Sequence, residues 1–201
     1  MKNRDDLFLD EKSPEKFEFN SKVAEVFDDM LKRSVPLYRE CQDLTVEWCK
    51  RLAKPDSCIY DLGCSTGSLL SPLARSIPDL PGLRLIGIDN SPAMLGKAHE
   101  KLGSFANSVS LVEADLNDSF SFNPACAIVM NYTLQFIAPE GRKSLLEQIY
   151  QSLIPDGGLI LNEKVLSEDE RLRETFVEMH HDFKQGHGYS QMEISKKRDA
   201  L

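Results

Sequence analysis

Residues 58–75 constrain the fold of this chain more than any other stretch. A short apolar run ends in Asp61, a turn with Gly63 and Gly67 follows, and a helical pattern completes the segment. This order predicts a strand, a tight turn and a helix, the first half of a βαβ unit. Because glycine has no Cβ, both positions permit positive φ and let a ligand approach the main chain. We therefore expect the turn to form the floor of a ligand site, although Ser65 stands where the dinucleotide fingerprint requires glycine.

Further apolar runs alternate with helical patterns along the rest of the chain. Polar segments separate them, among them the expected turn over residues 155–158 and the capping box from Ser190 to Glu193. Strands that alternate with helices in this rhythm are typical of a mostly parallel, doubly wound α/β sheet. Predicted strands cover residues 58–61, 83–88, 108–112, 125–130 and 159–161, and predicted helices cover 68–75, 93–102, 139–153, 168–184 and a segment after Ser190.

Two helical patterns precede the glycine turn. Asn20 is the expected N-cap of the first, and Pro36 and Pro55 mark the ends of the two helices. Both helices could simply cover the sheet, but Tyr38, between them, could instead lie over the mouth of a pocket. The expected apolar faces are Val23, Val26, Phe27, Met30 and Leu31 in the first helix, Cys41, Leu44, Trp48 and Leu52 in the second, and Leu145, Leu146, Ile149, Tyr150 and Leu153 in the helix over 139–153.

Polar side chains follow the later strands, at the sheet edge where the glycine turn lies. Asp89 comes after the second strand, where an acid can accept hydrogen bonds from ribose hydroxyls or can merely start a turn. Its place in the βα unit that follows Gly63 favours the ribose interpretation. After the third strand, Asp115 stands where an acceptor would meet an adenine amino group, with Leu116 against the ring. A polar and aromatic segment that begins with Asn131 follows the fourth strand.

Composition excludes several classes of protein. The formal net charge of −8 disfavours a tight grip on tRNA or DNA, whose affinity comes from neutralised phosphates, so a small-molecule substrate is expected. Five cysteines without paired spacing predict reduced thiols rather than disulfides or a zinc site. No metal is expected at His180 and His181, because adjacent helical residues face apart. A cytoplasmic protein is expected, since neither a membrane-spanning apolar run nor a secretory signal is present.

The glycine turn and the acids after the second and third strands together resemble class I S-adenosylmethionine-dependent methyltransferases. Segments outside this general pattern make the resemblance narrower, because they are similar to those of carboxy-S-adenosyl-L-methionine synthases. These segments are residues 4–8, 23–27, 33–38, 89–94, 131–136, 180–184, 188–190 and 193–198.

The resemblance implies a reaction in which S-adenosyl-L-methionine and prephenate give carboxy-S-adenosyl-L-methionine and phenylpyruvate. The product would feed carboxymethylation of a wobble uridine in tRNA by a separate enzyme. Arg198 would be the catalytic residue, because its guanidinium offers two parallel donors to the carboxylate that is added. The family also suggests a homodimer. By resemblance, the cofactor would be bound by Tyr38, Gly63, Cys64, Ser65, Asp89, Asn90, Asp115, Leu116 and Asn131.

The resemblance also predicts the domain organisation. Residues 1–55 would form an N-terminal arm and helical cap, and residues 56–201 a Rossmann-like domain that binds S-adenosylmethionine, within a single domain overall. Class I methyltransferase domains usually end with two further strands, and the sequence after Arg198 predicts that these carboxyl-terminal strands are absent from this chain. Two alternatives remain open. One is an ordinary small-molecule methyltransferase, and the other is a non-catalytic protein that binds the cofactor or interacts with a partner.

Overall fold

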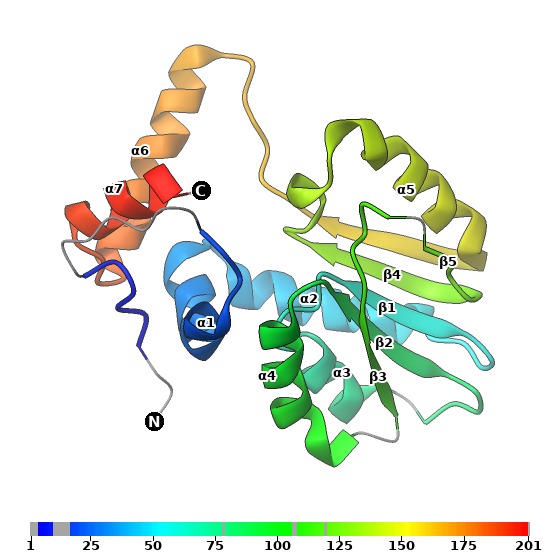
Figure 1. Ribbon diagram of the computed structural model, residues 1–201. Coiled ribbons are helices and arrows are strands. Elements are labelled where there is room, and N and C mark those ends of the chain that lie inside the picture. Colours follow the sequence, from blue (N-terminus) through cyan, green and yellow to red (C-terminus); the bar gives the residue numbers. More distant parts are fainter. Residues whose placement is uncertain (1–3, 10–16, 78, 106–107, 119, 201) are drawn as a thin grey trace. The chain divides into compact units, whose positions relative to one another are not determined.

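The computed structural model describes residues 4–9, 17–77, 79–105, 108–118 and 120–200 (Figure 1). The chain divides into two compact units, which are described separately. Unit 1 comprises residues 1–39 and 165–201, and unit 2 comprises residues 40–164. The sequence predicts a boundary at residue 55, and the division differs from it for a physical reason. Val46 and Cys49 are buried in the same core cluster as the first strand, so this part of the chain belongs with the sheet.

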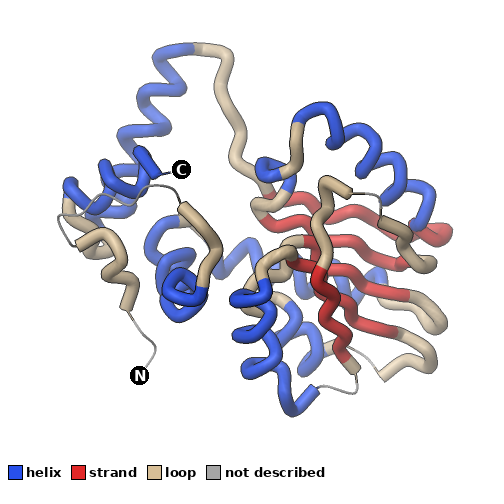
Figure 2. Tube along the Cα trace, viewed as in Figure 1, coloured by secondary structure: helices blue, strands red, loops and turns tan. Residues whose placement is uncertain are grey.

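Unit 2 contains a parallel sheet with the predicted doubly wound arrangement (Figure 2). The five strands among its described residues lie in the order β3-β2-β1-β4-β5, and each neighbouring pair is parallel. The chain moves outward from β1 to β3 and then returns to pair β4 with β1, which creates a switch point between β1 and β4. The strand bounds are β1 Cys58–Leu62, β2 Arg84–Asp89, β3 Val109–Glu113, β4 Ala125–Asn131 and β5 Leu153–Asn162.

Helices cover both faces of this sheet, and side chains alternate between the two (Figure 1). Ile59 and Leu85 belong to a core cluster shared with α2, α3 and α4, whereas Tyr60 and Ile86 belong to a cluster shared with α5. This alternation is the two-residue period of strands buried on both faces. The helices are α2 Tyr38–Leu52, which begins in unit 1, α3 Leu70–Ser76, α4 Pro92–Leu102 and α5 Pro139–Ser152, with short 3₁₀ turns η1 Gly103–Phe105 and η2 Leu134–Phe136.

The predicted apolar face of α2 is wrong at Leu44 and Trp48, whereas Leu52 packs against the core as predicted. Leu44 and Trp48 are 62% and 50% exposed, and the helix instead buries Thr45, Val46 and Cys49. The prediction favoured the large apolar side chains, whereas the smaller Val46 and Cys49 belong to the core cluster with β1. Tyr150 of α5 was also predicted to point inward and is 79% exposed.

The predicted turn at residues 155–158 lies inside β5 rather than before it. Ala125 of β4 pairs with Leu153, and Ala127 pairs with Gly158, so the register shifts between these two pairs. Asp156 has a positive φ of 63°, as expected of a residue in a turn. The turn residues therefore form an irregular bulge within a longer strand, which bends the edge of the sheet.

Unit 1 is helical, and two of its helix starts are as predicted. The Asn20 side chain caps α1 by accepting hydrogen bonds from the main-chain nitrogens of Lys22 and Val23. At the start of α7, Glu193 Oε2 accepts from Ser190 N at 2.7 Å, and Ser190 Oγ accepts from Glu193 N at 3.3 Å, which confirms the capping box. The helix bounds are α1 Ser21–Ser34, α6 Glu170–Gly186 and α7 Gln191–Ala200.

A buried charged cluster joins the amino-terminal segment to α1 and α7 within unit 1. Lys197 and Tyr189 both hydrogen-bond the carboxylate of Asp5, and all three side chains are buried. The Arg33 guanidinium lies 3.9 Å from the centre of the Tyr189 ring and 3.2 Å from Asp29 Oδ2. Buried charges need such partners, so these contacts hold the helices of unit 1 together. None of the described helices is both long and apolar enough to span a membrane.

Candidate functional site

The glycine turn follows β1, and neighbouring side chains and main-chain groups pack tightly against it. Gly63 and Gly67 have φ of 73° and 71°, the left-handed region that favours glycine. A Cβ at Gly63 would lie 2.5 Å from Oγ1 of Thr133, so no larger residue fits without displacing that side chain. The nitrogens of Gly63 and Cys64 both donate to Ile88 O, at 2.8 and 2.9 Å. The turn is thus fixed to the end of β2, and its shape does not depend on a ligand.

Asp89, the last residue of β2, binds this turn directly. Its Oδ2 accepts from Ser65 N and its Oδ1 accepts from Ser91 N, both at 2.9 Å. Burial raises the pKa of Asp89, and the hydrogen bonds from Ser91 and Ser65 oppose that rise. Each carboxylate oxygen retains a further lone pair. Asp89 can therefore hold the turn and accept hydrogen bonds from ligand hydroxyls at the same time.

Two buried groups, Asp61 at the end of β1 and Cys64 in the turn, have strongly raised pKa values. Burial, and secondarily the charge of Asp89, raises the pKa of Asp61 to about 7. Burial also raises the pKa of the Cys64 thiol far above its usual value, and the carboxyls of Asp61 and Asp89 add to the effect. A thiol of this kind is neutral and a poor nucleophile. Cys64 therefore contributes its main chain and its packing to the site.

The end of β3 offers an ionised acceptor beside an apolar side chain. Asp115 Oδ1 accepts from the main-chain and side-chain nitrogens of Asn117, at 2.9 and 2.8 Å, and Oδ2 accepts from Asn90 Nδ2 at 3.2 Å. The hydrogen bonds from Asn117 and Asn90 lower the pKa of Asp115. Leu116 is 8% exposed and packs into the cluster shared with β2. Asn90, which follows β2, therefore contacts the carboxylate that follows β3.

Asn131 ends β4, and its side chain is oriented by residues that the sequence analysis did not single out. Its Oδ1 accepts from Asn162 Nδ2 at 2.6 Å, and the same nitrogen lies 3.2 Å from Thr45 Oγ1. Next to it, Thr133 Oγ1 donates to Leu62 O at 2.8 Å. On the far side of the glycine turn, Lys101 of α4 donates to two hydroxyls of the turn, Thr66 at 3.0 Å and Ser68 at 2.9 Å. Thr133 lies in the segment 131–136 that carries the family resemblance. The other supporting residues belong to no recognisable motif, so only their positions in the fold identify them; they are Thr45, Lys101 and Asn162.

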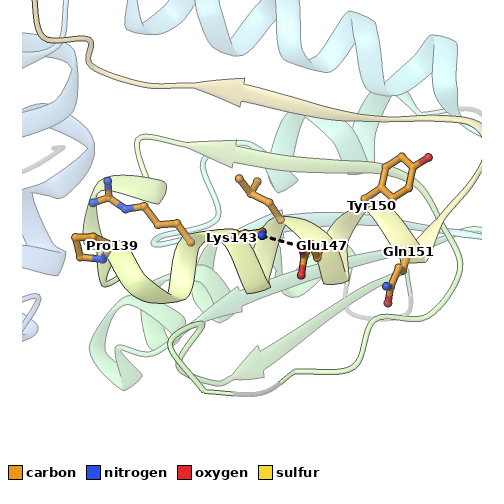
Figure 3. A pocket seen from close by; sticks show the side chains of 7 residues that line it. Pro139, Lys143, Glu147, Tyr150 and Gln151 are labelled. Carbon is orange, nitrogen blue, oxygen red and sulfur yellow. Dashed lines mark ion pairs between the residues drawn. The ribbon is translucent and has the colours of Figure 1, made fainter.

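Unit 2 therefore brings the predicted cofactor contacts of four strand ends to one edge of the sheet. A surface hollow of about 510 Å³ lies elsewhere, along the outer side of α5 (Figure 3). Its lining comes from α5 alone and includes the ion pair between Lys143 and Glu147 at 3.8 Å, so it is a groove on a helix rather than part of the site. Among the described residues, no group of three or more histidine, cysteine or acidic side chains is arranged to hold a metal.

Comparison with known proteins agrees with this geometry. The family model described as "Methyltransferase domain" matches residues 59–157, which contain the four strand ends. The carboxy-S-adenosyl-L-methionine synthase of Aliivibrio fischeri is 44% identical over 187 residues, covering 92% of this chain and 76% of that protein. The enzyme of the same name from Wolinella succinogenes is 44% identical over 199 residues, covering 98% of this chain and 82% of that protein. The chain belongs to the carboxy-S-adenosyl-L-methionine synthase family.

Membership of the carboxy-S-adenosyl-L-methionine synthase family confirms the prediction of an enzyme, a transferase, and S-adenosyl-L-methionine is the cofactor that the family name carries. A solved structure from Methanococcus maripaludis, described as an S-adenosyl-L-methionine-dependent methyltransferase, is similar in fold. Its TM-score is 0.58 at 18% identity, and the match covers 94% of this chain and 86% of that one. This likeness confirms the class I methyltransferase fold.

Two residues that the synthase resemblance assigns to the site belong to unit 1. Tyr38 is the first residue of α2 and is 9% exposed. Arg198 lies in α7, where its side chain is 63% exposed, with NH2 2.8 Å from Asp199 Oδ1 and 3.4 Å from Ser195 Oγ. Its neighbour Lys197 is buried in the cluster with Asp5. The Arg198 guanidinium is therefore exposed and paired with the carboxylate of Asp199, and the roles of Tyr38 and Arg198 remain predictions.

Proposed function

We propose that this chain binds S-adenosyl-L-methionine and carboxylates its methyl group with prephenate as the carboxyl donor. The identity of 44% to carboxy-S-adenosyl-L-methionine synthases over 92% of the chain is the observation that carries the proposal. It extends well beyond residues 59–157, the part shared with methyltransferases in general. The chain therefore resembles the synthases in segments that an ordinary methyltransferase does not need.

Each predicted cofactor contact in unit 2 has a chemically suitable role. Asp89 accepts from the ribose hydroxyls, and Asp115 accepts from the adenine amino group while Leu116 packs against the ring. The turn at Gly63 lies next to the methionine part, because glycine has no Cβ, and Asn131 completes the site at the end of β4. The order of the strand ends, β3, β2, β1 and β4, along the edge of the sheet supports these roles.

The proposed reaction conserves atoms and electrons without an external oxidant. S-adenosyl-L-methionine supplies a methyl group whose C–H bonds are polarised by the sulfonium. Prephenate loses carbon dioxide and its ring hydroxyl as its ring becomes aromatic, which gives phenylpyruvate. The methyl carbon loses one proton and forms a carbon–carbon bond to that carbon dioxide, and the proton leaves with the hydroxyl as water. Arg198 pairs with the new carboxylate, and exclusion of water protects the reacting carbon.

The wider role of this chain is proposed on the same basis. The product supplies the carboxymethyl group for a wobble uridine of tRNA, which a separate enzyme modifies. The net charge of −8 supports this division of labour, because a chain that only makes the donor has no need to grip tRNA. A homodimer in the cytoplasm is part of the proposal.

The mass of the adenosyl product tests this function. The purified chain is incubated with S-adenosyl-L-methionine, with and without prephenate, and we expect an adenosyl product heavier by one carboxyl group only when prephenate is present. Accumulation of S-adenosylhomocysteine would instead indicate a methyltransferase, and unchanged S-adenosyl-L-methionine would contradict any turnover. Both outcomes would overturn the proposal.

Arg198→Ala tests the proposed carboxylate contact separately. We expect the wild type to prefer carboxy-S-adenosyl-L-methionine over S-adenosyl-L-methionine by roughly tenfold to a hundredfold, the worth of a charge-assisted bidentate contact. The variant should bind both ligands almost equally, and Arg198→Lys should retain part of the preference because it keeps the charge without the fork. Titration of both ligands into all three proteins measures this. An undiminished preference in Arg198→Ala would exclude Arg198 from the site.

A further inference from the structure

The carboxyl ends of β4 and β5 carry a residue with an unusual backbone. Tyr132, directly after Asn131, has φ of 57°, a conformation that bulky residues rarely adopt. Three hydrogen bonds hold the segment in place: Tyr132 N donates to Asn162 O at 2.7 Å, Gln135 Nε2 donates to Tyr132 O at 2.8 Å, and Leu134 N donates to Glu163 Oε1 at 2.6 Å. Strained conformations that the surroundings over-determine in this way gather at functional sites.

The Tyr132 side chain is a neutral hydrogen-bond donor in a half-buried position. Its hydroxyl lies near the Cys41 thiol on α2 and near the Glu163 carboxylate, and both groups affect its protonation. Burial, then Cys41 and then Glu163 raise the pKa of Tyr132 to about 12. The phenol therefore keeps its proton at neutral pH. Nearby Glu163 disfavours a second carboxylate here, so the complementary ligand atom is an uncharged oxygen.

The strand order places Tyr132 at the border of the proposed cofactor contacts. Most of those contacts follow β1, β2 and β3, and Asn131 extends them to the end of β4. Tyr132 comes directly after Asn131, and its main-chain nitrogen bonds Asn162 at the end of β5, so it lies beyond the switch point between β1 and β4. Open α/β sheets bind ligands in the crevice at such a switch point. A second reactant that meets the cofactor there has to lie along the ends of β4 and β5.

We propose that Tyr132 is a specificity-determining residue for the second substrate, and that its hydroxyl donates a hydrogen bond to a hydroxyl or carbonyl oxygen of an organic acid. The inference rests on the proposed function, in which prephenate is the second substrate. Prephenate carries both a ring hydroxyl and a keto oxygen that could accept this hydrogen bond. The left-handed backbone holds Tyr132 at the strand ends, and the incoming oxygen accepts the hydrogen bond of the phenol beside the Cys41 thiol. Asn131 and Asn162 fix the neighbouring strand ends through their amide contact.

Cys41 offers a probe that does not depend on turnover. It is the one half-exposed cysteine of the chain, and the other four, Cys49, Cys58, Cys64 and Cys126, are buried. Because Cys41 contacts Tyr132, a ligand on the phenol should shield its thiol. We expect prephenate to slow the alkylation of Cys41 by iodoacetamide. Mass spectrometry of the labelled peptide measures the alkylation rate. S-adenosyl-L-methionine alone should leave the rate nearly unchanged.

Tyr132→Phe removes only the hydroxyl, and Tyr150→Phe on the exposed side of α5 is its matched control. We expect Tyr132→Phe to need about fivefold to tenfold more prephenate for the same protection of Cys41, the worth of one neutral hydrogen bond. S-adenosyl-L-methionine affinity, measured by calorimetry, should stay within about twofold. Tyr150→Phe should change neither quantity. Tyr132→Gly relieves the backbone strain and should lose protection as Tyr132→Phe does, which separates recognition from folding.

The outcomes separate this inference from the proposed function. Protection of Cys41 by prephenate in a wild type that makes no carboxylated product would overturn the proposed function and support the subsite. Absence of protection in the wild type would overturn the subsite, whatever the activity. The subsite is also wrong if Tyr132→Phe leaves the protection by prephenate unchanged, or if it weakens binding of the cofactor as much as that of prephenate.

Discussion

The ends of β1–β3 and the ends of β4–β5 lie along one sheet edge of unit 2 but are built in different ways. The first region is held mainly by the main chain. Gly63 and Cys64 donate to the main-chain oxygen of Ile88, and the Asp89 carboxylate adds a side-chain contact to Ser65 N. The second region is held by side chains, as in the contact of Asn131 with Asn162 at 2.6 Å. Hydrogen bonds between main-chain atoms persist when most side chains are replaced, provided that Gly63 and Gly67 are kept. Contacts between side chains are lost when either residue is replaced.

This difference bears on function. A cofactor that many enzymes share can be bound by main-chain groups and a few acidic side chains, because the same contacts serve in each enzyme. A second substrate that differs from enzyme to enzyme suits a site made from exchangeable side chains. The experiments below test whether the two regions differ as this comparison requires.

Gly63→Ala should have the largest effect on stability, because it places a side chain in the most tightly packed part of the glycine turn. The new Cβ would lie 2.5 Å from Thr133 Oγ1 at a φ of 73°. Left-handed strain and overpacking together should lower the free energy of unfolding by about 3–5 kcal/mol. Chemical denaturation measures this. Gly96→Ala in α4, where a Cβ meets nothing within 4 Å, is the control and should be neutral or stabilising. Equal losses at Gly63 and Gly96 would contradict the account of the turn.

Asp61 should make the stability of the fold depend on pH. Its pKa is raised from 3.8 to about 7, so the folded protein is more stable when Asp61 is protonated than when it is ionised. Its contribution is therefore fully present below about pH 4 and is lost as the pH rises through about 7. We expect the free energy of unfolding to fall by about 3 kcal/mol from this group between those limits.

Asp61→Asn removes the titrating group and should flatten that part of the profile. Urea denaturation at a series of pH values compares the two proteins. If both lose the same free energy between about pH 4 and about pH 8, Asp61 does not titrate in this range and the assignment is wrong.

The sequence predicted the backbone-built region far better than the other. Apolar runs located the five described strands, and Gly63, Gly67, Asp89 and Asp115 marked the ends of the first three. These features are local, because a strand, its turn and its acid are contiguous in the chain. Helix caps are local as well, and Asn20 and Ser190 were identified for that reason.

The region at β4 and β5 could be predicted only in part. Asn131 was identified by resemblance, but its partner Asn162 lies 31 residues away, and Thr45 lies 117 residues from Asn162. No period or motif links residues so distant, so their contact appears only when the strands are assembled. The same limit explains the face of α2, where Thr45 and Cys49 are buried in place of Leu44 and Trp48.

Asp89→Ala should weaken S-adenosyl-L-methionine binding more than any change at β4 or β5. It removes the acceptor for Ser65 N and for the ribose hydroxyls, so we expect a loss of about 1–3 kcal/mol in binding free energy. Calorimetry on the wild type and the variant measures it. The exposed Asp118, just beyond the end of β3, provides the control, since Asp118→Ala should leave the affinity nearly unchanged. An unaltered affinity in Asp89→Ala would remove Asp89 from the cofactor site and erase the contrast between the two regions.

Thr45→Val should have the smallest effect and should appear in stability rather than in cofactor affinity. Thr45 Oγ1 donates to Cys41 O at 2.8 Å and accepts from Asn162 Nδ2 at 3.2 Å. Valine keeps the shape and removes both contacts, while Asn162 retains its bond to Asn131. We expect a loss of about 1 kcal/mol in the free energy of unfolding, and a change below about twofold in S-adenosyl-L-methionine affinity. Thr175→Val, at an exposed threonine of α6 whose hydroxyl donates to Arg171 O, controls for the loss of a surface hydroxyl. If Thr45→Val weakens cofactor binding as strongly as Asp89→Ala does, the two regions act as one site, and the division between a backbone-built and a side-chain-built half is wrong.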